Sequence, residues 1–422
     1  MKPVRQLTWM LILVTSIGLA TAWPAAADSV VRLGDDPRLG ELTVTAFATG
    51  LSFPTGMVAL PDGSILVATS APGEGGYFDS TGELLRLTDH DADGVADGPG
   101  TLLATGLPGT LVSLALAGDL VLTTSAAYGD EQIVVLRKGE TWRDPLEPAG
   151  TLRLRFDRFE HQSYGLAARP SPDVDGSYEV VFNVGAWSND ADGRTVRVEG
   201  LGVDAELVDA SLYRTTVTDE GDGVTATPPE LIATGLRNAA AIVFDPATGD
   251  LLISDNGIDT PADRIVSLSA DALYRLSAGE IGGAVEDFGF PDAYVDSATG
   301  EVVGERTIAP EVSFRPLDGA ESEGVASVAL TPAGFPDALR GVVAGFHGQY
   351  DLAGTENEEN PLLLSDEATG GSIELIANAD PNIGHIDGLL STETTLYAAD
   401  LCAGSLTETA PCGAIYAVRA AG

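Results

Sequence analysis

Four aspartates alternate with other residues in a short loop that begins at Asp89. Asp89, Asp91, Asp93 and Asp97 stand at positions 1, 3, 5 and 9 of this loop, and a glycine stands at position 6. Carboxylates at this spacing are typical of the first half of an EF-hand calcium loop, in which the glycine permits a sharp turn. The glutamate expected at position 12 is absent, because Gly100 stands there. The spacing therefore predicts a short structural calcium site, and the alternative is an ordinary Asp/Gly turn.

The chain contains two cysteines, Cys402 and Cys412, in a segment rich in glycine, serine and threonine. In an oxidising compartment such a pair predicts a local disulfide. Closing so short a loop would contribute at most about 3 kcal/mol and would mainly order the loop itself. A catalytic or metal-binding pair is disfavoured, because no third soft ligand lies close by in the sequence.

The composition is strongly acidic. The chain has 63 acidic and 22 basic residues and a formal net charge of −41, and its only lysines are Lys2 and Lys138. Such a charge repels nucleic acids and anionic membranes, so neither is expected as a partner. Self-repulsion of this size also favours screening by salt or bound cations, which suggests a halophilic source. A coding bias toward arginine is the alternative for the missing lysines, although it does not explain the excess of acids.

The first 27 residues have the pattern of a secretory signal peptide. Basic residues precede a short apolar run, and small residues of the A-x-A type stand before Asp28. The run is short for a membrane span, which needs about 20 apolar residues, and the alternative is an uncleaved anchor. We therefore expect a secreted or periplasmic protein whose mature part, residues 28–422, folds as a single domain.

These candidate residues must be positioned by strands, because helical patterns are rare in this sequence. A unit of two apolar strands joined by a Gly- or Asp-containing turn recurs six times. In the first copy, the turn Pro61-Asp62-Gly63 separates two β-rich runs, which is a strong hairpin signal. A sandwich would need about seven to nine strands, and this chain offers more than twenty. The repeats predict an all-β fold, a six-bladed β-propeller, with polar insertions such as residues 185–202 and 351–360 on its faces.

Several short motifs follow one another along this repeat. They are residues 50–56, His161, Gly235-Leu236-Arg237-Asn238 with Thr248-Gly249, Asp255-Asn256-Gly257, Phe288-Gly289-Phe290-Pro291, Phe335-Pro336 with Arg340-Gly341, and His347-Gly348. In this order they resemble the soluble quinoprotein glucose/sorbosone dehydrogenases, which oxidise sugars with pyrroloquinoline quinone (PQQ). The resemblance extends over most of residues 28–422 and implies a PQQ- and calcium-dependent oxidoreductase that acts on a hydroxyl of a sugar or related alcohol.

The resemblance also assigns roles to individual residues. His161 would be the base that removes the hydroxyl proton, which a neutral imidazole can do at ordinary pH. Arg237 and Asn238 would hold the quinone, the arginine through a bidentate contact with an anionic group, and Tyr350 could stack on its ring. The alternatives are a histidine bonded to a neighbouring backbone group, an arginine paired with the many acids, and a tyrosine in the core.

The family places a calcium ion against its cofactor, and one acidic loop of this chain matches that position. The loop offers oxygen ligands from Asp255, Asn256, Asp259 and Asp263, and Gly257 would let backbone carbonyls approach the ion. The alternative is a solvated acidic turn.

The sequence departs from the family after His347-Gly348. The family continues there with Ser-Trp and a basic residue, whereas this chain reads Gln349-Tyr350-Asp351. An aspartate beside an anionic quinone would be repulsive. Two other functions therefore stay open: a non-catalytic extracellular, calcium-stabilised propeller that binds carbohydrate or a protein partner, and a calcium-dependent hydrolase of the lactonase type. The sequence leaves the electron acceptor unknown.

Overall fold

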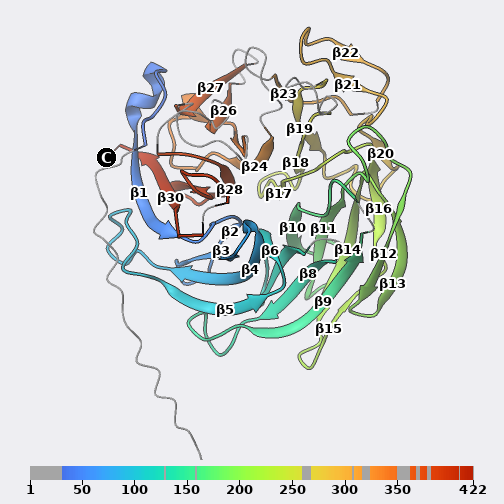
Figure 1. Cartoon of the computed structure of the whole chain (residues 1–422), viewed down its shortest axis with the longest axis horizontal. Coiled ribbons are helices and arrows are strands. Elements are labelled where there is room, and N and C mark those ends of the chain that lie inside the picture. Colours follow the sequence, from blue (N-terminus) through green and yellow to red (C-terminus); the bar gives the residue numbers. More distant parts are fainter. Residues whose placement is uncertain are drawn as a thin grey trace, which may run out of the picture.

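The computed structural model describes residues 31–127, 130–156, 159–258, 268–306, 308–315, 324–348, 362–366, 371–377, 382–407 and 409–421. Within these residues six antiparallel sheets surround a common axis as the blades of a β-propeller (Figure 1). The fold class expected from the repeats is confirmed. The leader lies outside the described residues.

Blades 1 to 3 are built from the first half of the described chain. Blade 1 contains β2 (Met57–Ala59), β3 (Ile65–Gly73), β4 (Gly76–Leu87) and β5 (Thr101–Leu107). Blade 2 contains β6 (Thr110–Ala117), β7 (Leu120–Ala126), β8 (Glu131–Arg137) and β9 (Glu147–Arg155). Blade 3 contains β10 (Leu166–Pro170), β11 (Ser177–Val184), β14 (Ser211–Asp219) and β16 (Glu230–Thr234), with β15 (Val224–Ala226) and β20 (Glu286–Asp287) at its edges.

Blades 4 to 6 complete the ring. Blade 4 contains β17 (Ile242–Phe244), β18 (Leu251–Asp255), β19 (Asp271–Leu276) and β23 (Val312–Phe314), and a separate hairpin, β21 (Tyr294–Val295) with β22 (Val302–Val303), lies between its last two strands in sequence. Blade 5 contains β24 (Val325–Leu330), β25 (Val342–Phe346), β26 (Leu362–Asp366) and β27 (Gly371–Ile376). Blade 6 contains β28 (Ile386–Ser391), β29 (Thr395–Asp400), β30 (Gly413–Ala420) and β1 (Leu42–Leu51). The described chain also contains two short 3₁₀ helices, η1 (Pro37–Glu41) and η2 (Asp337–Leu339).

The ring closes through both ends of the described chain. The first strand of each blade contacts the first strands of both neighbouring blades, from β2 and β6 around to β28 and back to β2. Strand β1, which precedes all the blades in sequence, pairs with the C-terminal β30 as the outer strand of blade 6. The last blade therefore forms only when the two ends of the chain meet.

Each sequence repeat corresponds to the first two strands of one blade. In blade 1 the turn between β2 and β3 needs the left-handed conformation that Gly63 adopts, with φ of +84°. Asp62 completes this turn by accepting the backbone N–H of Ser64 at 3.1 Å. The turn signal in the sequence thus has the expected structural cause.

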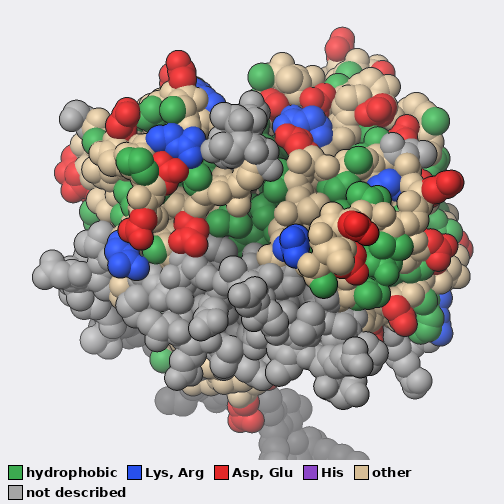
Figure 2. Space-filling model, turned by 90° about the horizontal axis from the view of Figure 1, so that it is seen from above, with side chains coloured by type: hydrophobic (Ala, Val, Ile, Leu, Met, Phe, Trp, Pro, Cys, Tyr) green, Lys and Arg blue, Asp and Glu red, His purple; other side chains and the backbone are tan. Residues whose placement is uncertain are grey.

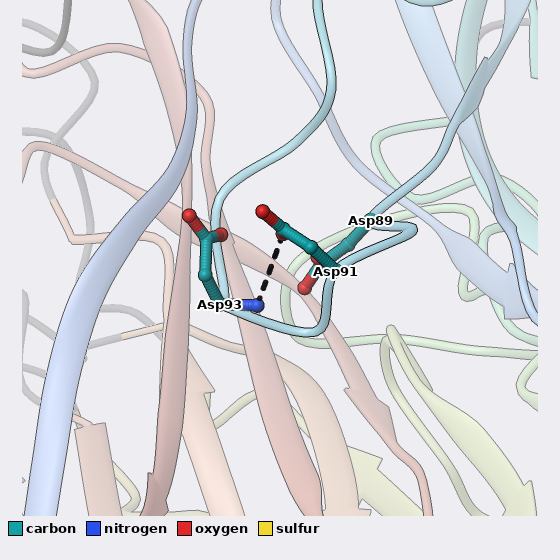
Figure 3. A group of neighbouring side chains, drawn as sticks. All are labelled: Asp89, Asp91 and Asp93. Carbon is teal, nitrogen blue, oxygen red and sulfur yellow. Dashed lines mark hydrogen bonds between the residues drawn. The ribbon is translucent and has the colours of Figure 1, made fainter.

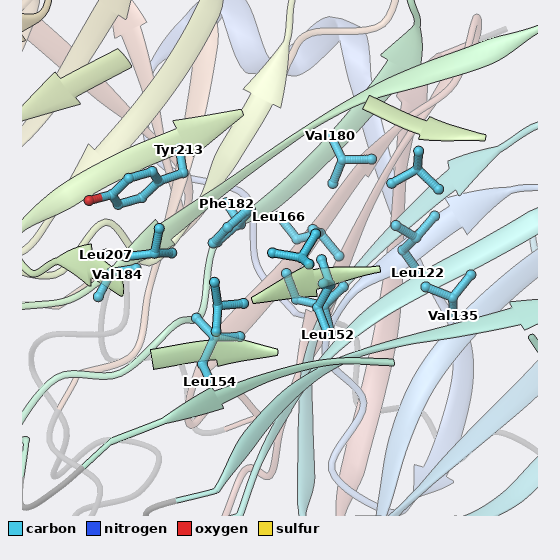
Figure 4. Packing of buried hydrophobic residues seen from close by; sticks show 14 of the residues in the cluster. Leu122, Val135, Leu152, Leu154, Leu166, Val180, Phe182, Val184, Leu207 and Tyr213 are labelled. Carbon is cyan, nitrogen blue, oxygen red and sulfur yellow. The ribbon is translucent and has the colours of Figure 1, made fainter. Parts of the chain in front are cut away.

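The hydrophobic core lies between blades rather than at the centre. Successive residues of a strand point to opposite sides of a sheet, so Leu66 and Ala68 pack toward blade 2, whereas Ile65 and Val67 pack toward blade 6. Every one of the six interfaces between neighbouring blades contains such a cluster. Figure 4 shows the cluster between blades 2 and 3, with Leu122 and Val135 on one side and Leu166, Val180 and Phe182 on the other.

One insertion extends a neighbouring blade instead of lying on a face as a loop. Between β11 and β14 of blade 3 the chain forms a hairpin, β12 (Thr195–Gly200) and β13 (Val203–Val208). Strand β12 pairs antiparallel with β9 at the outer edge of blade 2, so that this sheet gains two strands (Figure 1). The expectation of a polar surface loop over residues 185–202 is therefore wrong for its second half. The other expected insertion, residues 351–360, lies outside the described residues.

The predicted disulfide is confirmed. Cys402 and Cys412 are bonded, with Cα atoms 4.8 Å apart, and Cys402 packs against Phe53 and Tyr77 of blade 1. The bridge closes the loop between β29 and β30 and holds it against the neighbouring blade.

The surface reflects the composition. On the face that Figure 2 shows, Asp and Glu side chains are scattered over the described part, with fewer Lys and Arg side chains between them. Among the described residues we find no helix with the length and apolar character that a membrane crossing requires.

Candidate functional site

His161, Arg237, Asn238 and Asp255 lie at one end of the propeller, which we call the entry face. There the first strand of each blade begins, the second strand ends and the third begins, because neighbouring strands are antiparallel. His161 precedes β10, Arg237 and Asn238 precede β17, and Asp255 ends β18. The fold thus brings residues far apart in sequence to the same end of the molecule.

A repeated clamp holds the segments that lead into three of the blades. The last residue of the second strand, or its neighbour, accepts two backbone N–H groups from the segment that leads into the same blade. The donors are Tyr164 and Gly165 to Asn183, Arg237 and Asn238 to Asp255, and Gly384 and His385 to Asp400, at N···O distances from 2.7 to 3.2 Å. Buried N–H groups need such acceptors, and these segments are too irregular to supply them from a strand.

A second clamp joins neighbouring blades. Glu131, at the start of β8 in blade 2, accepts the backbone N–H of Ser163 at 2.6 Å. Asp271, at the start of β19 in blade 4, accepts the backbone N–H of Val325 in blade 5 at 3.1 Å and that of Gly257 at 2.6 Å. Several buried acids on the entry face therefore hold the backbone.

One ring nitrogen of His161 is available to accept a proton. Its backbone N–H donates to the carbonyl of Ala186 at 3.2 Å, while its Nε2 is buried and has no hydrogen-bond partner among the described residues. Burial lowers the pKa of His161 well below 6.5, and the positive charge of Arg237 lowers it further. The imidazole is thus neutral at ordinary pH, and Nε2 can accept a proton.

Arg237 is fixed in place beside His161. Its side chain is buried, and its guanidinium donates from Nε to the backbone carbonyl of Asn189 at 3.1 Å and from Nη2 to Oδ1 of Asn189 at 2.6 Å. Its backbone carbonyl accepts the N–H of Ala186 at 2.8 Å. The charge of Arg237 acts on both His161 and Asp255, so the three predicted residues form one group.

Two groups of Asn238 form hydrogen bonds within the protein. Its Nδ2 donates to Oδ1 of Asn256 at 2.7 Å, and its backbone N–H donates to Asp255 at 2.7 Å. Its Oδ1 is buried and has no partner among the described residues. Asn238 and His161 therefore each present one buried acceptor atom that the protein itself leaves unused.

Asp255 and Asn256, which the sequence suggested as calcium ligands, are hydrogen-bonded within the protein. Both carboxylate oxygens of Asp255 accept backbone N–H groups, from Arg237 and Asn238. Oδ1 of Asn256 accepts from Asn238, and its Nδ2 donates to the carbonyl of Val325 at 3.1 Å. Each of these side-chain oxygens therefore already accepts one hydrogen bond from the protein. Asp259 and Asp263 lie outside the described residues, as does Tyr350.

Burial also changes the ionisation of Asp255. Burial raises its pKa to about 7, although the two backbone hydrogen bonds and Arg237 act in the opposite direction. Asp255 is thus not a permanently charged group.

A cavity behind Arg237 is too small for a substrate. It is lined by Arg237, Asp255, Tyr274, Phe288 and Tyr294, among others, and has a volume of about 20 Å³. A site of this size has room for about one water molecule. This cavity therefore does not hold a sugar or a quinone.

The structure reveals a second histidine cluster that the sequence did not indicate. Nδ1 of His347, which follows β25, is bonded to the carboxylate of Asp387 in β28, at 2.8 and 2.9 Å. Burial lowers the pKa of His347, but Asp387 raises it by more, to above 6.5. His385 donates to the carbonyl of His347 at 2.6 Å, and burial with the nearby charge of His347 lowers its pKa to about 4. The pairing links two blades, so no sequence motif contains it.

The first predicted calcium loop has the geometry of a cation site. Side-chain oxygens of Asp89, Asp91 and Asp93 all lie within 4.8 Å of one another (Figure 3). Oδ1 of Asp89 is buried and has no hydrogen-bond partner among the described residues. The loop is held by Arg419, which donates to the carbonyl of Ala92 at 3.1 Å, and by Gly94, whose N–H donates to Asp89 at 2.9 Å.

Asp97 does not join this group of three. Its carboxylate accepts the backbone N–H of His90 at 2.5 Å and is bonded to Nδ1 of His90 at 2.8 Å. The four-residue ligand set that the spacing suggested is thus reduced to three, and the exposed His90 closes the turn.

Several solved structures share the fold of this chain. No protein-family model and no curated protein matches the chain. Among solved structures, the PQQ-bound aldose sugar dehydrogenase of Streptomyces coelicolor is 16% identical, with 90% of this chain and 98% of that protein covered at a TM-score of 0.56. The holo PQQ domain of pyranose dehydrogenase from Coprinopsis cinerea is 14% identical over 92% and 97%, at 0.59. The calcium structure of the Trichoderma reesei carbohydrate-active enzyme of family AA12 is 14% identical over 93% and 97%, at 0.58. The chain thus has the propeller fold of the soluble PQQ-dependent sugar dehydrogenases.

Proposed function

We propose that this protein is a quinone-dependent oxidoreductase that oxidises a hydroxyl group of a sugar or related alcohol on its entry face. The observation that carries the proposal is His161, a neutral, half-buried imidazole whose buried Nε2 has no partner among the described residues and which feels the charge of Arg237. The likeness of the whole fold to sugar dehydrogenases that bind PQQ supports the same reaction.

The chemistry of the base follows from its surroundings. Oxidation of an alcohol removes a proton from oxygen and a hydride from carbon, so a base must be held near the C–O–H group. His161 is neutral throughout the physiological range because its pKa is lowered by burial and by Arg237. Nε2 would accept the hydroxyl proton, and the positive charge that His161 then acquires makes it ready to release that proton to water.

Arg237, Asn238 and Tyr350 would hold the quinone. The guanidinium supplies the cationic partner that a carboxylate-bearing cofactor needs, and the unpaired Oδ1 of Asn238 fits a donor on a bound molecule. Bound PQQ would supply the two-electron acceptor for the hydride, which protein side chains cannot provide. The residues of this chain would orient the ligand, remove its proton and exclude water.

Calcium would have a structural role in the first loop rather than a role beside Asp255. The oxygens of Asp255 and Asn256 are committed to the protein, whereas Asp89, Asp91 and Asp93 converge and Asp89 keeps an unpaired buried oxygen. A cation there would also offset part of the repulsion in a chain with a net charge of −41. A metal role for the second loop would rest on Asp259 and Asp263.

The convergence of Asp89, Asp91 and Asp93 also fits one alternative function, a secreted, calcium-stabilised propeller that binds carbohydrate or a protein partner without catalysis. Titration of the purified protein with PQQ in high salt, with and without Ca²⁺, separates the two. Micromolar PQQ binding together with aldose-dependent dye reduction supports the oxidoreductase. Absence of PQQ binding by the folded protein favours the binding module.

A further inference from the structure

Asn189 contacts the side chain of Arg237 twice. The backbone carbonyl and Oδ1 of Asn189 accept from two different nitrogens of the guanidinium, at 3.1 and 2.6 Å. A planar guanidinium that is bound at two nitrogens cannot rotate about its terminal bonds without losing a hydrogen bond. Asn189 therefore fixes both the position and the plane of this charge.

The loop that carries Asn189 is itself held rigidly. It runs from the end of β11 to the start of β12, and the carboxylate of Asp209 accepts backbone N–H groups from both of its arms, at distances from 2.8 to 3.1 Å; the donors are Trp187, Gly193 and Arg194. The guanidinium of Arg194 lies over the ring of Trp187, 4.1 Å from its centroid. A side chain on such a loop has little freedom to move.

The same loop also connects His161 with Arg237 through the backbone. The carbonyl of Ala186 accepts the N–H of His161 at 3.2 Å, and the N–H of Ala186 donates to the carbonyl of Arg237 at 2.8 Å. Displacement of the loop would thus change the distance between the proposed base and the neighbouring charge. Since β12 is paired with blade 2, the loop ties blades 2, 3 and 4 together at this point.

From these contacts we infer that Asn189 is a positioning residue, which holds the Arg237 guanidinium against His161 and so sets the charge that a ligand on the entry face meets. The inference deepens the proposed function and rests on it for the identity of the ligand. The contacts themselves require neither a quinone nor a sugar, so the role of Asn189 can be measured in the protein alone.

The consequence for chemistry is a base that stays unprotonated. A fixed cation next to the ring disfavours protonation of His161, whereas a guanidinium free to move into solvent would be screened by water. Loss of the Asn189 side chain should therefore raise the proton affinity of His161. It should also weaken binding of a carboxylate-bearing ligand to Arg237.

NMR titration of the histidine ring protons of the full-length protein tests this role. The chain has four histidines, so single His→Gln variants assign every signal. Asn189→Ala removes the Oδ1 contact and keeps the backbone carbonyl, so the guanidinium can turn away from His161. We expect this change to raise the pKa of His161 enough to strengthen its proton binding about threefold or more. Arg237→Gln should cause a similar rise, and the double variant should add little to either single change.

Ser188→Ala is the matched control, because Ser188 lies in the same loop and its hydroxyl donates to Asp190, at 3.3 Å, rather than to Arg237. It should leave the titration of His161 unchanged. An unchanged His161 titration in Asn189→Ala, with the fold intact by circular dichroism, would overturn the inference. A fully additive double variant would overturn it as well. A failure of the wild-type protein to bind PQQ would instead count against the proposed function and leave this result standing.

Discussion

Asp255 and Asp400 occupy equivalent positions in blades 4 and 6. Each ends the second strand of its blade, and the carboxylate of each accepts the backbone N–H groups of two consecutive residues that lead into the same blade. Burial raises the pKa of both to about 7. An acid that looks like a metal ligand in the sequence thus has a counterpart in blade 6 with the same kind of backbone contact.

The pH dependence of stability should report this clamp at Asp400. Its folded pKa of about 7 lies above the unfolded value of about 3.9, so the folded protein binds more protons between these pH values. The contribution of Asp400 is therefore fully present below about pH 3.9 and is lost as the pH rises through 7, by an amount on the order of a few kcal/mol. Asp400→Asn should make the free energy of unfolding depend less on pH in this range. Asp337→Asn is the control, because it removes the same charge from a fully exposed site; an equal flattening in both variants would count against the clamp.

The histidine pair formed by His347 and Asp387 predicts a specific titration. The pKa of His347 should lie above 6.5 and that of His385 near 4. Asp387→Asn should move the pKa of His347 below 6.5, because only burial then acts on the ring. Since the folded pKa is raised, the stability that this pair contributes is present below about pH 6.5 and is lost as the pH rises through the folded value. NMR measures both pKa values. A pKa of His347 that is the same in the wild type and in Asp387→Asn would refute the pairing.

Calcium should stabilise the protein through the first acidic loop. Ca²⁺ at about 100 times its dissociation constant would add about 2.7 kcal/mol to the free energy of unfolding. In thermal unfolding, Ca²⁺ should raise the unfolding temperature of the wild type. It should not raise that of Asp89→Asn or Asp93→Asn. Asp97→Asn, in the same loop, removes an equal charge from a residue that is bonded to His90 and should keep the response. Calcium stabilisation that survives in all three variants would place the ion elsewhere.

The hairpin added to blade 2 should contribute to the core. Leu207 in β13 is 3% exposed and packs between blades 2 and 3, whereas its neighbour Val208 is 41% exposed. Leu207→Ala should cost about 2–5 kcal/mol in the free energy of unfolding, and Val208→Ala about 0.5 kcal/mol or less. Chemical denaturation measures both. Equal effects of the two substitutions would mean that the hairpin does not pack as described.

The repeat architecture could be predicted from the sequence because two local signals agreed in every unit. Strand residues alternate toward two neighbouring blades, and turn residues such as Gly63 stand where a left-handed backbone is needed. The pairing of β12 with blade 2 could not be predicted, because it joins segments from different units. The alternation in residues 195–208 around Gly200 and Gly202 was nevertheless a usable hairpin signal.

The candidate site was only partly predictable for the same reason. Local motifs located His161 and Arg237, and the fold places them together. Asn189 and the pair formed by His347 and Asp387 act through contacts between blades, which no short motif encodes. The backbone contacts of Asp255 could not be predicted, because an acidic residue followed by Asn-Gly looks the same in sequence whether it binds a metal ion or backbone N–H groups.

The most direct test of the proposed function is aldose-dependent dye reduction by the mature protein supplied with PQQ and Ca²⁺ in high salt, compared between the wild type and His161→Gln. Removal of a general base typically lowers the rate by about 10²–10⁴-fold. We predict turnover by the wild type, a loss of this size in His161→Gln, and unchanged PQQ binding in the variant. Folded wild-type protein that shows no PQQ-dependent turnover with any aldose or related alcohol tested, or a His161→Gln variant that is as active as the wild type, would contradict the account.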